Sequence, residues 1–263
     1  MATCKLCKKE KNLIKKSHII PEFLYNDLYD EKHQLIRFDA IEMAKGNDKT
    51  SKLPQGEYEG ELLCKECDNE KIGQFETYLG NILNKKKLAV EQKPNCQRII
   101  NDEGVEFTRI ENINYKSLKL CLLSIIWCAS ISKRPLFKDV DLGPYEEKIR
   151  EQIFSETPNE DTNIPIVIMS WNNDKKTATD IIAQPTRHKK DAKTYYSFVI
   201  NGFIILYGIT PGAINKELES LRLQSDNTLS IVHLPKGKGM DFMVNYTGAA
   251  AEIKLKALKQ KNS

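Results

Sequence analysis

The chain has 263 residues, of which 40% are hydrophobic and 29% are charged, and its formal net charge at pH 7 is +4. That length suffices for one or two domains, and the composition is that of an ordinary globular protein. No apolar run reaches the ~18 residues of a membrane-spanning helix, and the charged N-terminus is unlike a secretion signal, so we expect a cytoplasmic protein without membrane contact. The mild positive charge neither proves nor excludes a nucleic-acid partner.

Two Cys-x-x-Cys pairs are the strongest signal in the N-terminal part. An odd total of seven cysteines, with no export signal, argues against a disulfide framework. Two such pairs can place four thiolates around one ion at ~2.3 Å and so complete a closed tetrahedral site. A redox dithiol is the alternative, but it ordinarily lies in a βαβ unit, and the sequence shows no such context. We therefore expect a structural Zn²⁺ on four ligands: Cys4, Cys7, Cys64 and Cys67.

Three helices and a hairpin are predicted in the middle of the chain. Apolar residues at helical spacing predict a helix over residues 72–88. A turn signal between two runs of alternating residues indicates a β-hairpin over residues 98–110. Residues 114–132 form a helix with little polar surface, so we expect it to be buried between the N-terminal module and a C-terminal sheet. A proline near its start marks the third helix, over residues 144–154.

The C-terminal half changes to β-branched and aromatic runs separated by turn residues, which is typical of an antiparallel sheet. His188 is expected in a polar loop, and helices are expected over residues 211–223 and 249–260. The fold class is therefore α+β: a small zinc-knuckle module at residues 1–95, then a larger α+β domain at residues 96–263. Whether the second domain binds a protein partner or forms a homo-oligomer stays open. The expected strands cover residues 164–171, 178–184, 195–207, 229–234 and 241–246.

Further motifs lie between and after the cysteine pairs. Residues 17–21 read SHIIP, and residues 62–71 read LLCKECDNEK. In this order the motifs resemble the zinc-containing HNH endonucleases, or ββα-metal fold, over residues 4–76. The sequence comes closest to a divergent group of that family that reads SHIIPEF near its start. The resemblance implies a metal-dependent hydrolase of phosphodiester bonds in nucleic acid, with DNA as the expected substrate and defence against phage or foreign DNA as the expected role.

The resemblance also assigns roles to matching residues. His18 takes the place of the general base, because hydrolysis needs a water that has lost a proton and an imidazole titrates near pH 7. A backbone carbonyl near Glu59 or Gly60 would orient its ring. Asp68 takes the place of a ligand to a catalytic Mg²⁺ or Mn²⁺, ions that prefer oxygen donors. Lys71 takes the place of a residue that contacts a phosphate.

Two departures from the family pattern bear on the metal. Ser17 stands where the family has an Asp or His ligand, and the family's Asn is not evident. A hydroxyl is a weak ligand, so a carboxylate has to complete the site, and Glu59 or Glu61 is the better candidate. Glu76 is less favoured, because eight residues of α-helix separate it from Asp68 by ~12 Å.

The same departures support a second hypothesis, in which the chain is a catalytically degenerate zinc-knuckle module that binds nucleic acid or protein. Asp68 would then be a carboxylate at a helix N-terminus, where the helix dipole favours negative charge. The surroundings of His18 distinguish the two hypotheses. A catalytic His18 should lie beside carboxylates, whereas His18 of a binding module should point into an apolar core.

Overall fold

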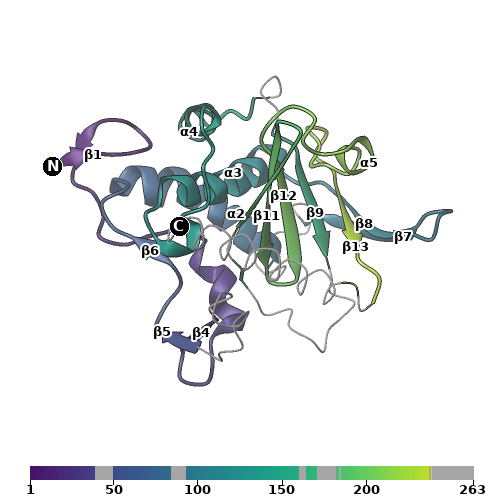
Figure 1. The fold of residues 1–263 in the computed structure, drawn as a ribbon, viewed down its shortest axis with the longest axis horizontal. Helices are drawn as coiled ribbons and strands as arrows, with labels where there is room; N and C mark the ends of the chain where they lie inside the picture. Colours follow the sequence, from purple (N-terminus) through teal and green to yellow (C-terminus); the bar gives the residue numbers. More distant parts are fainter. Residues whose placement is uncertain are drawn as a thin grey trace, which may run out of the picture.

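The computed structural model describes residues 1–38, 50–83, 93–159, 164–170, 182–183, 185–236 and 238. A seven-stranded sheet lies on one side of a group of helices, and the N-terminal ribbons lie on the other side (Figure 1). The predicted fold class, α+β with a zinc-knuckle cysteine cluster and a mostly antiparallel sheet, is confirmed. No helix in these residues is long and apolar enough to cross a membrane.

The N-terminal part consists of three short antiparallel ribbons and one 3₁₀ helix, η1, which starts directly after Pro21. Gly60 shows how closely these segments approach, because a Cβ at this position would lie 2.7 Å from the carbonyl oxygen of Lys15. Only glycine allows that approach without a shift of the backbone. The elements are β1 (Ala2–Thr3) with β2 (Glu10–Lys11), β3 (Ser17–His18) with β6 (Tyr58–Glu59), β4 (Leu35–Phe38) with β5 (Thr50–Leu53), and η1 (Glu22–Leu28).

A helix begins within the second cysteine pair, earlier than predicted. It begins with a π-helical segment, η2 (Glu66–Ile72), and continues as α2 (Gly73–Leu83). The early start follows from the cysteine turn itself, because the amide of Asp68 donates to the carbonyl of Cys64 at 3.0 Å. The amide of Gly73 donates to the carbonyl of Asp68, which is the i→i+5 bond of a π-helix. The predicted residues 84–88 lie outside the described part of the chain.

The long helix α3 (Tyr115–Ile131) is buried over most of its length, as predicted. Asn114 caps its N-terminus by accepting a hydrogen bond from the amide of Ser117 at 2.9 Å. Its surroundings explain why it is apolar on every side, since α2, α4 (Tyr145–Ser155) and the sheet all pack against it. One hydrophobic core therefore runs from the cysteine turns through α3 to the sheet, with Leu6, Phe75, Leu120, Trp127, Phe198 and Tyr207 among its members.

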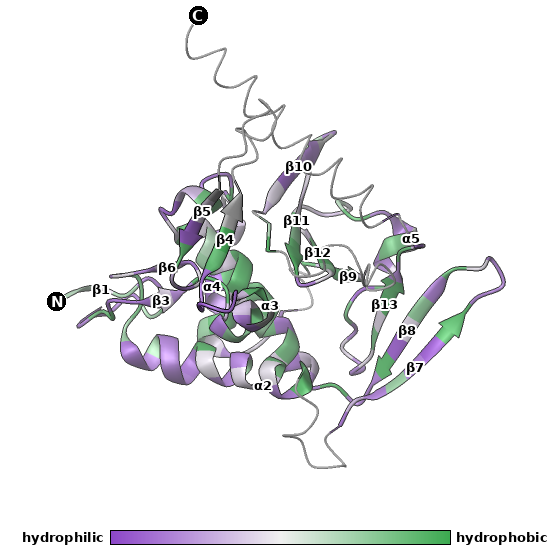
Figure 2. Cartoon of the chain, turned by 90° about the horizontal axis from the view of Figure 1, so that it is seen from below, coloured by the Kyte–Doolittle hydropathy of each residue, from purple (hydrophilic) through white to green (hydrophobic). Residues whose placement is uncertain are grey.

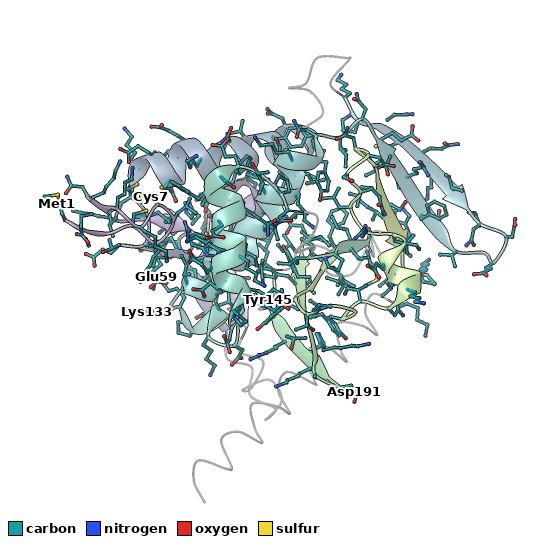
Figure 3. All side chains as sticks on the ribbon, turned by 90° about the horizontal axis from the view of Figure 1, so that it is seen from above. Met1, Cys7, Glu59, Lys133, Tyr145 and Asp191 are labelled. Atoms are coloured by element: carbon teal, nitrogen blue, oxygen red, sulfur yellow. The ribbon has the colours of Figure 1, made fainter. Side chains whose placement is uncertain are left out.

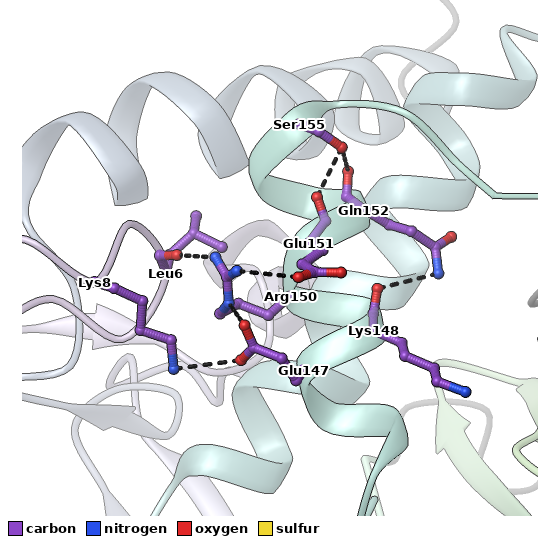
Figure 4. A network of polar contacts seen from close by, with 8 residues as sticks. All are labelled: Leu6, Lys8, Glu147, Lys148, Arg150, Glu151, Gln152 and Ser155. Atoms are coloured by element: carbon purple, nitrogen blue, oxygen red, sulfur yellow. Dashed lines mark hydrogen bonds and ion pairs between the residues drawn. The ribbon is translucent and has the colours of Figure 1, made fainter.

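The helix α4 is fastened to the first cysteine turn by Arg150 (Figure 4). Nη1 of Arg150 donates to the carbonyl of Leu6 at 2.6 Å, and its side chain is only 11% exposed. Glu147 pairs with Nε of Arg150 at 2.6 Å and with Lys8 at 3.4 Å. These contacts join two parts of the chain that lie more than 140 residues apart in sequence.

Replacing Arg150 should therefore loosen the cysteine turn. We expect Arg150→Met to lower the free energy of unfolding by about 1–3 kcal/mol, because the carbonyl of Leu6 loses a donor with a full positive charge. Lys148→Ala is the matched control on the same helix, since Lys148 makes no contact with the turn in Figure 4. Urea unfolding of both variants measures the difference, and equal midpoints would contradict a structural role for Arg150.

The sheet has the strand order β10-β11-β12-β9-β13-β8-β7. Neighbouring strands are antiparallel, except that β13 runs parallel to β9. Figure 2 shows apolar residues along the strands beside α3, and the β7–β8 hairpin extends away from the rest of the sheet. The strands are β7 (Asn95–Ile100), β8 (Glu106–Glu111), β9 (Ile166–Ser170), β10 (Thr186–Lys190), β11 (Lys193–Ile200), β12 (Phe203–Gly208) and β13 (Leu229–His233).

Several predicted elements differ from the structure. The polar stretch around His188 is not a loop but the edge strand β10, which has a neighbour on one side only and tolerates a polar sequence. Residues 195–207 are not one strand, because a turn at Asn201 and Gly202 divides them into β11 and β12. The helix expected at residues 211–223 is only α5 (Lys216–Glu219). The elements expected at residues 241–246 and 249–260, and most of that at 178–184, lie outside the described residues.

Candidate metal centre and active site

The four cysteines of the two pairs form one cluster. Their Sγ atoms all lie within 4.8 Å of one another. A tetrahedral zinc with bonds of ~2.3 Å needs sulfur atoms about 3.8 Å apart, so small side-chain movements suffice to bind the ion. The cluster therefore fits a metal ion with four thiolate ligands, as the sequence predicts, and such a site is closed to substrate.

The backbone around the cluster explains how two distant turns meet. The amide of Cys64 donates to Sγ of Cys4 at 3.3 Å, and the amide of Lys5 donates to the carbonyl of Leu62 at 2.9 Å. Burial raises the pKa of the Cys64 thiol to about 11. Burial also acts on Cys4, but hydrogen bonds from backbone amides hold its pKa below the ordinary value. Four thiolates in such a site are stable only with a cation, which links metal binding to folding.

His18 lies on the β3–β6 ribbon, where it is paired with Tyr58. Its Nε2 is 3.1 Å from Oε2 of Glu22, the first residue of η1, and its side chain is 33% exposed. His18 therefore lies beside a carboxylate and does not point into an apolar core. The Glu22 carboxylate is the group nearest Nε2 that the structure records, where the resemblance implies a backbone carbonyl near Glu59 or Gly60. Nδ1 of His18 has no hydrogen-bond partner in the part of the chain described above.

Ser17 and Asp68 are in direct contact. Oγ of Ser17 donates to Oδ1 of Asp68 at 2.5 Å, so the two positions that the motif resemblance relates to a catalytic metal meet in space. Burial raises the pKa of Asp68, while the Ser17 hydrogen bond and the nearby charge of His18 oppose that rise. Asp68 also lies in the first turn of η2, where the helix dipole favours a negative charge. Its position is thus the one that both hypotheses require.

Glu76 lies on α2 within electrostatic reach of Asp68. Burial, with a further contribution from the charge of Asp68, raises the pKa of the Glu76 carboxyl to about 7. The π-helical turn between them explains the proximity, because each residue of a π-helix advances and rotates the chain less than a residue of an α-helix. The separation of ~12 Å expected for a regular α-helix therefore overstates the distance along the axis.

The raised pKa of Glu76 makes stability depend on pH. Its folded value of about 7 exceeds the ordinary 4.5, so ionisation destabilises the folded state as pH rises between these values. We expect Glu76→Gln to unfold like the wild type at pH 4 and to be more stable by up to about 3 kcal/mol at pH 8. Urea unfolding at both pH values measures this gain, with Glu151→Gln on α4 as an exposed control. If Glu76→Gln is no more stable than the wild type at pH 8, the Glu76 carboxyl is not a buried group with a raised pKa.

Two of the other three candidate residues have partners elsewhere, and the third is exposed. Oε2 of Glu59 accepts hydrogen bonds from Oγ of Ser132 at 2.6 Å and from the amide of Lys133 at 2.8 Å, and Figure 3 shows Glu59 and Lys133 side by side. Glu61 is exposed, in a turn with a positive φ of 62°. Nζ of Lys71 pairs with Glu156 at 2.8 Å. The structure thus brings together Ser17, His18 and Asp68, whereas Glu59 and Lys71 have other partners and Glu61 is exposed.

A hollow of about 490 Å³ opens beside the cysteine cluster rather than beside His18. Lysines and glutamates line it in similar numbers, so it has no strong charge of either sign. Ser17, His18 and Asp68 are absent from its lining. Its walls include Lys9, Lys11, Glu66, Glu70, Lys71 and Glu156.

Comparisons with protein-family models, with curated proteins and with solved structures found no match. The motif resemblance over residues 4–76 therefore rests only on the two cysteine pairs and on the SHIIP and LLCKECDNEK motifs. Two side chains of the site were not foreseen from the sequence. Glu22 is four residues after His18, but the helical i,i+4 rule does not apply to them, because His18 lies on β3 and Glu22 begins η1. Arg134, which is bonded to Tyr58, comes from the segment after α3, and no local signal connects it with His18.

Proposed function

We propose that this protein is a metal-dependent HNH-type endonuclease that hydrolyses phosphodiester bonds of nucleic acid, with DNA as the expected substrate. The observation that carries the proposal is the position of His18. It is partly exposed, it is paired with Glu22, and it lies one residue from the Ser17–Asp68 contact. The proposed role in defence against phage or foreign DNA rests only on the family resemblance.

The ring nitrogens of His18 have different roles in this proposal. Nε2 of His18 lies 3.1 Å from the negative Glu22 carboxylate, and this proximity favours the tautomer with the proton on Nε2 and a lone pair on Nδ1. Nδ1 then takes a proton from water, the hydroxide oxygen bonds to phosphorus, and the bond from phosphorus to the 3′ oxygen breaks. The pair of electrons from that bond leaves with the 3′ oxygen, which takes a proton from a solvent water, and His18 returns its extra proton to the hydroxide that this leaves.

Asp68 would hold a catalytic Mg²⁺ or Mn²⁺, with the hydroxyl of Ser17 beside it. The donor set fits such an ion, because carboxylate and hydroxyl oxygens are hard ligands. The two oxygens are hydrogen-bonded at 2.5 Å and would have to separate to the ~3 Å between neighbouring ligands of an octahedral ion with bonds of ~2.1 Å. A bound divalent cation supplies stabilisation of negative charge on the leaving oxygen. Glu76 is the second carboxylate in electrostatic reach of Asp68 and replaces Glu59 and Glu61 as the candidate to complete the site.

One observation favours the degenerate binding module as a second candidate function. Ser17 is a neutral residue at a position where the family has an Asp or His ligand, and it is hydrogen-bonded to Asp68, so the metal position carries less negative charge than one with two carboxylates. The module would then keep its structural zinc and bind nucleic acid or a protein without cleaving it.

Incubation of the purified, zinc-loaded protein with supercoiled plasmid separates the two candidates. With added Mg²⁺ or Mn²⁺, a nuclease converts the plasmid to nicked and linear forms, and it does not do so when the divalent ion is omitted. A gel-shift measurement on the same plasmid runs in parallel. Binding without cleavage in either ion would support the degenerate module and reject the nuclease.

A further inference from the structure

A pair of cations lies over the ring of Tyr58, the residue paired with His18. Nζ of Lys16 is 5.0 Å from the centroid of this ring, and Cζ of Arg134 is 5.2 Å from it. The ring of His18 is 6.5 Å from the ring of Tyr58 and meets it edge to face. A positively charged surface thus adjoins the candidate general base.

Arg134 is held in place from several directions. Its Nε donates to the carbonyl of Tyr58 at 2.7 Å, and its amide donates to Oγ of Ser132 at 3.1 Å. Ser132 and the amide of Lys133 are in turn bonded to the Glu59 carboxylate, which fixes the segment after α3 on β6. Glu59 therefore acts as a positioning residue for Arg134.

The remaining donors of these two side chains point to a ligand. The terminal nitrogens of Arg134 form no hydrogen bond or ion pair with the residues that the structure describes, and Lys16 makes only a long bond of 3.3 Å to Gln55. A guanidinium with a fixed Nε and available terminal nitrogens is pre-organised for bidentate binding of phosphate. Binding of a phosphate would cost Arg134 little side-chain entropy, because its contacts with Tyr58 already hold the side chain in place.

We propose that Arg134 and Lys16, supported by Tyr58 and Glu59, form a binding site for backbone phosphates of nucleic acid next to His18. This inference rests on the proposed function and names residues that would hold the substrate strand at that site. Because phosphate contacts set position but carry no sequence information, the site should bind strands of any sequence. Arg134 lies outside the region that resembles the nuclease family, so this contact would belong to this chain's own C-terminal part.

Fluorescence anisotropy with short labelled DNA duplexes, without added Mg²⁺ or Mn²⁺, tests the proposal. We expect Arg134→Ala and Lys16→Ala each to weaken binding about three- to tenfold and to reduce the slope of log affinity against log salt by about 1, equally for two unrelated sequences. Arg134→Lys keeps the charge without the fork and should fall between Arg134→Ala and the wild type. Arg222→Ala is the control, since Arg222 follows α5 at the opposite end of the molecule from β6 (Figure 1).

The outcomes separate this inference from the proposed function. If the wild type cleaves plasmid while Arg134→Ala and Lys16→Ala bind as tightly as Arg222→Ala, the phosphate site is refuted and the nuclease stands. If the wild type binds duplexes through these residues but never cleaves, the nuclease is refuted and the phosphate site stands. A wild type that binds no duplex at low salt refutes the phosphate site. Lys16 is exposed, so its variant gives an answer even if Arg134→Ala folds poorly.

Discussion

Cys64→Ser should abolish tight metal binding and remove most of the stability of the protein. Serine is a far weaker ligand for zinc than a thiolate, and the free energy of zinc binding is part of the free energy of folding. Structural zinc sites of small modules contribute about 10 kcal/mol or more, which is comparable to the whole stability of an ordinary domain. Because Cys4, Cys64 and Cys67 belong to the same hydrophobic core as α3, the loss should extend to that helix.

Cys96→Ser is the matched control, because Cys96 is exposed on β7 and lies outside the cluster. Elemental analysis should find about one zinc per wild-type chain and per Cys96→Ser chain, and much less in Cys64→Ser. Thermal unfolding should show a lower midpoint for Cys64→Ser alone. A folded wild-type protein that contains no metal would overturn the assignment of the cluster.

The cysteine pairs could be predicted because their spacing is a local property with a simple geometric meaning. Two turns of this kind direct four thiolates at one centre. The prediction therefore did not depend on the structure of the residues between them, Lys8 to Leu63. The buried helix α3 was predictable for a similar reason, since a helix without a polar face has to be surrounded. Hydrophobic periodicity thus gave the fold class and the order of its main elements.

The candidate site was less predictable, because its contacts depend on irregular backbone and on distant segments. The π-helical segment η2 changes the spacing between Asp68 and Glu76, and no residue pattern in the sequence predicts it. Glu59 was expected near a metal, but the loop after α3 brings Ser132 to its carboxylate. That contact joins residues 73 positions apart and arises from tertiary packing alone.

His18→Ala should lower the rate of phosphodiester cleavage by about 10²- to 10⁴-fold while leaving zinc content and stability unchanged. The range is that of a lost general base, since the remaining groups still bind substrate. The imidazole makes no contact with the cysteine cluster, so the structural ion should not depend on it. Single-turnover cleavage of labelled duplex measures the rate, and elemental analysis and thermal unfolding serve as the checks. A variant that cleaves as fast as the wild type would exclude His18 as the base.

Ser17→Asp tests whether position 17 and Asp68 together bind a divalent cation, and Ser17→Ala is the control. A second carboxylate beside Asp68 creates a like-charge pair that a cation relieves, so Ser17→Asp should be less stable than Ser17→Ala without a divalent ion. Added Mn²⁺ should reverse that order and lower the metal concentration that cleavage requires. If the wild type is inert and Ser17→Asp cleaves, the chain descends from a nuclease and has lost one ligand. If Mn²⁺ stabilises neither variant and neither one cleaves, Asp68 is a helix-end carboxylate and the catalytic proposal is wrong.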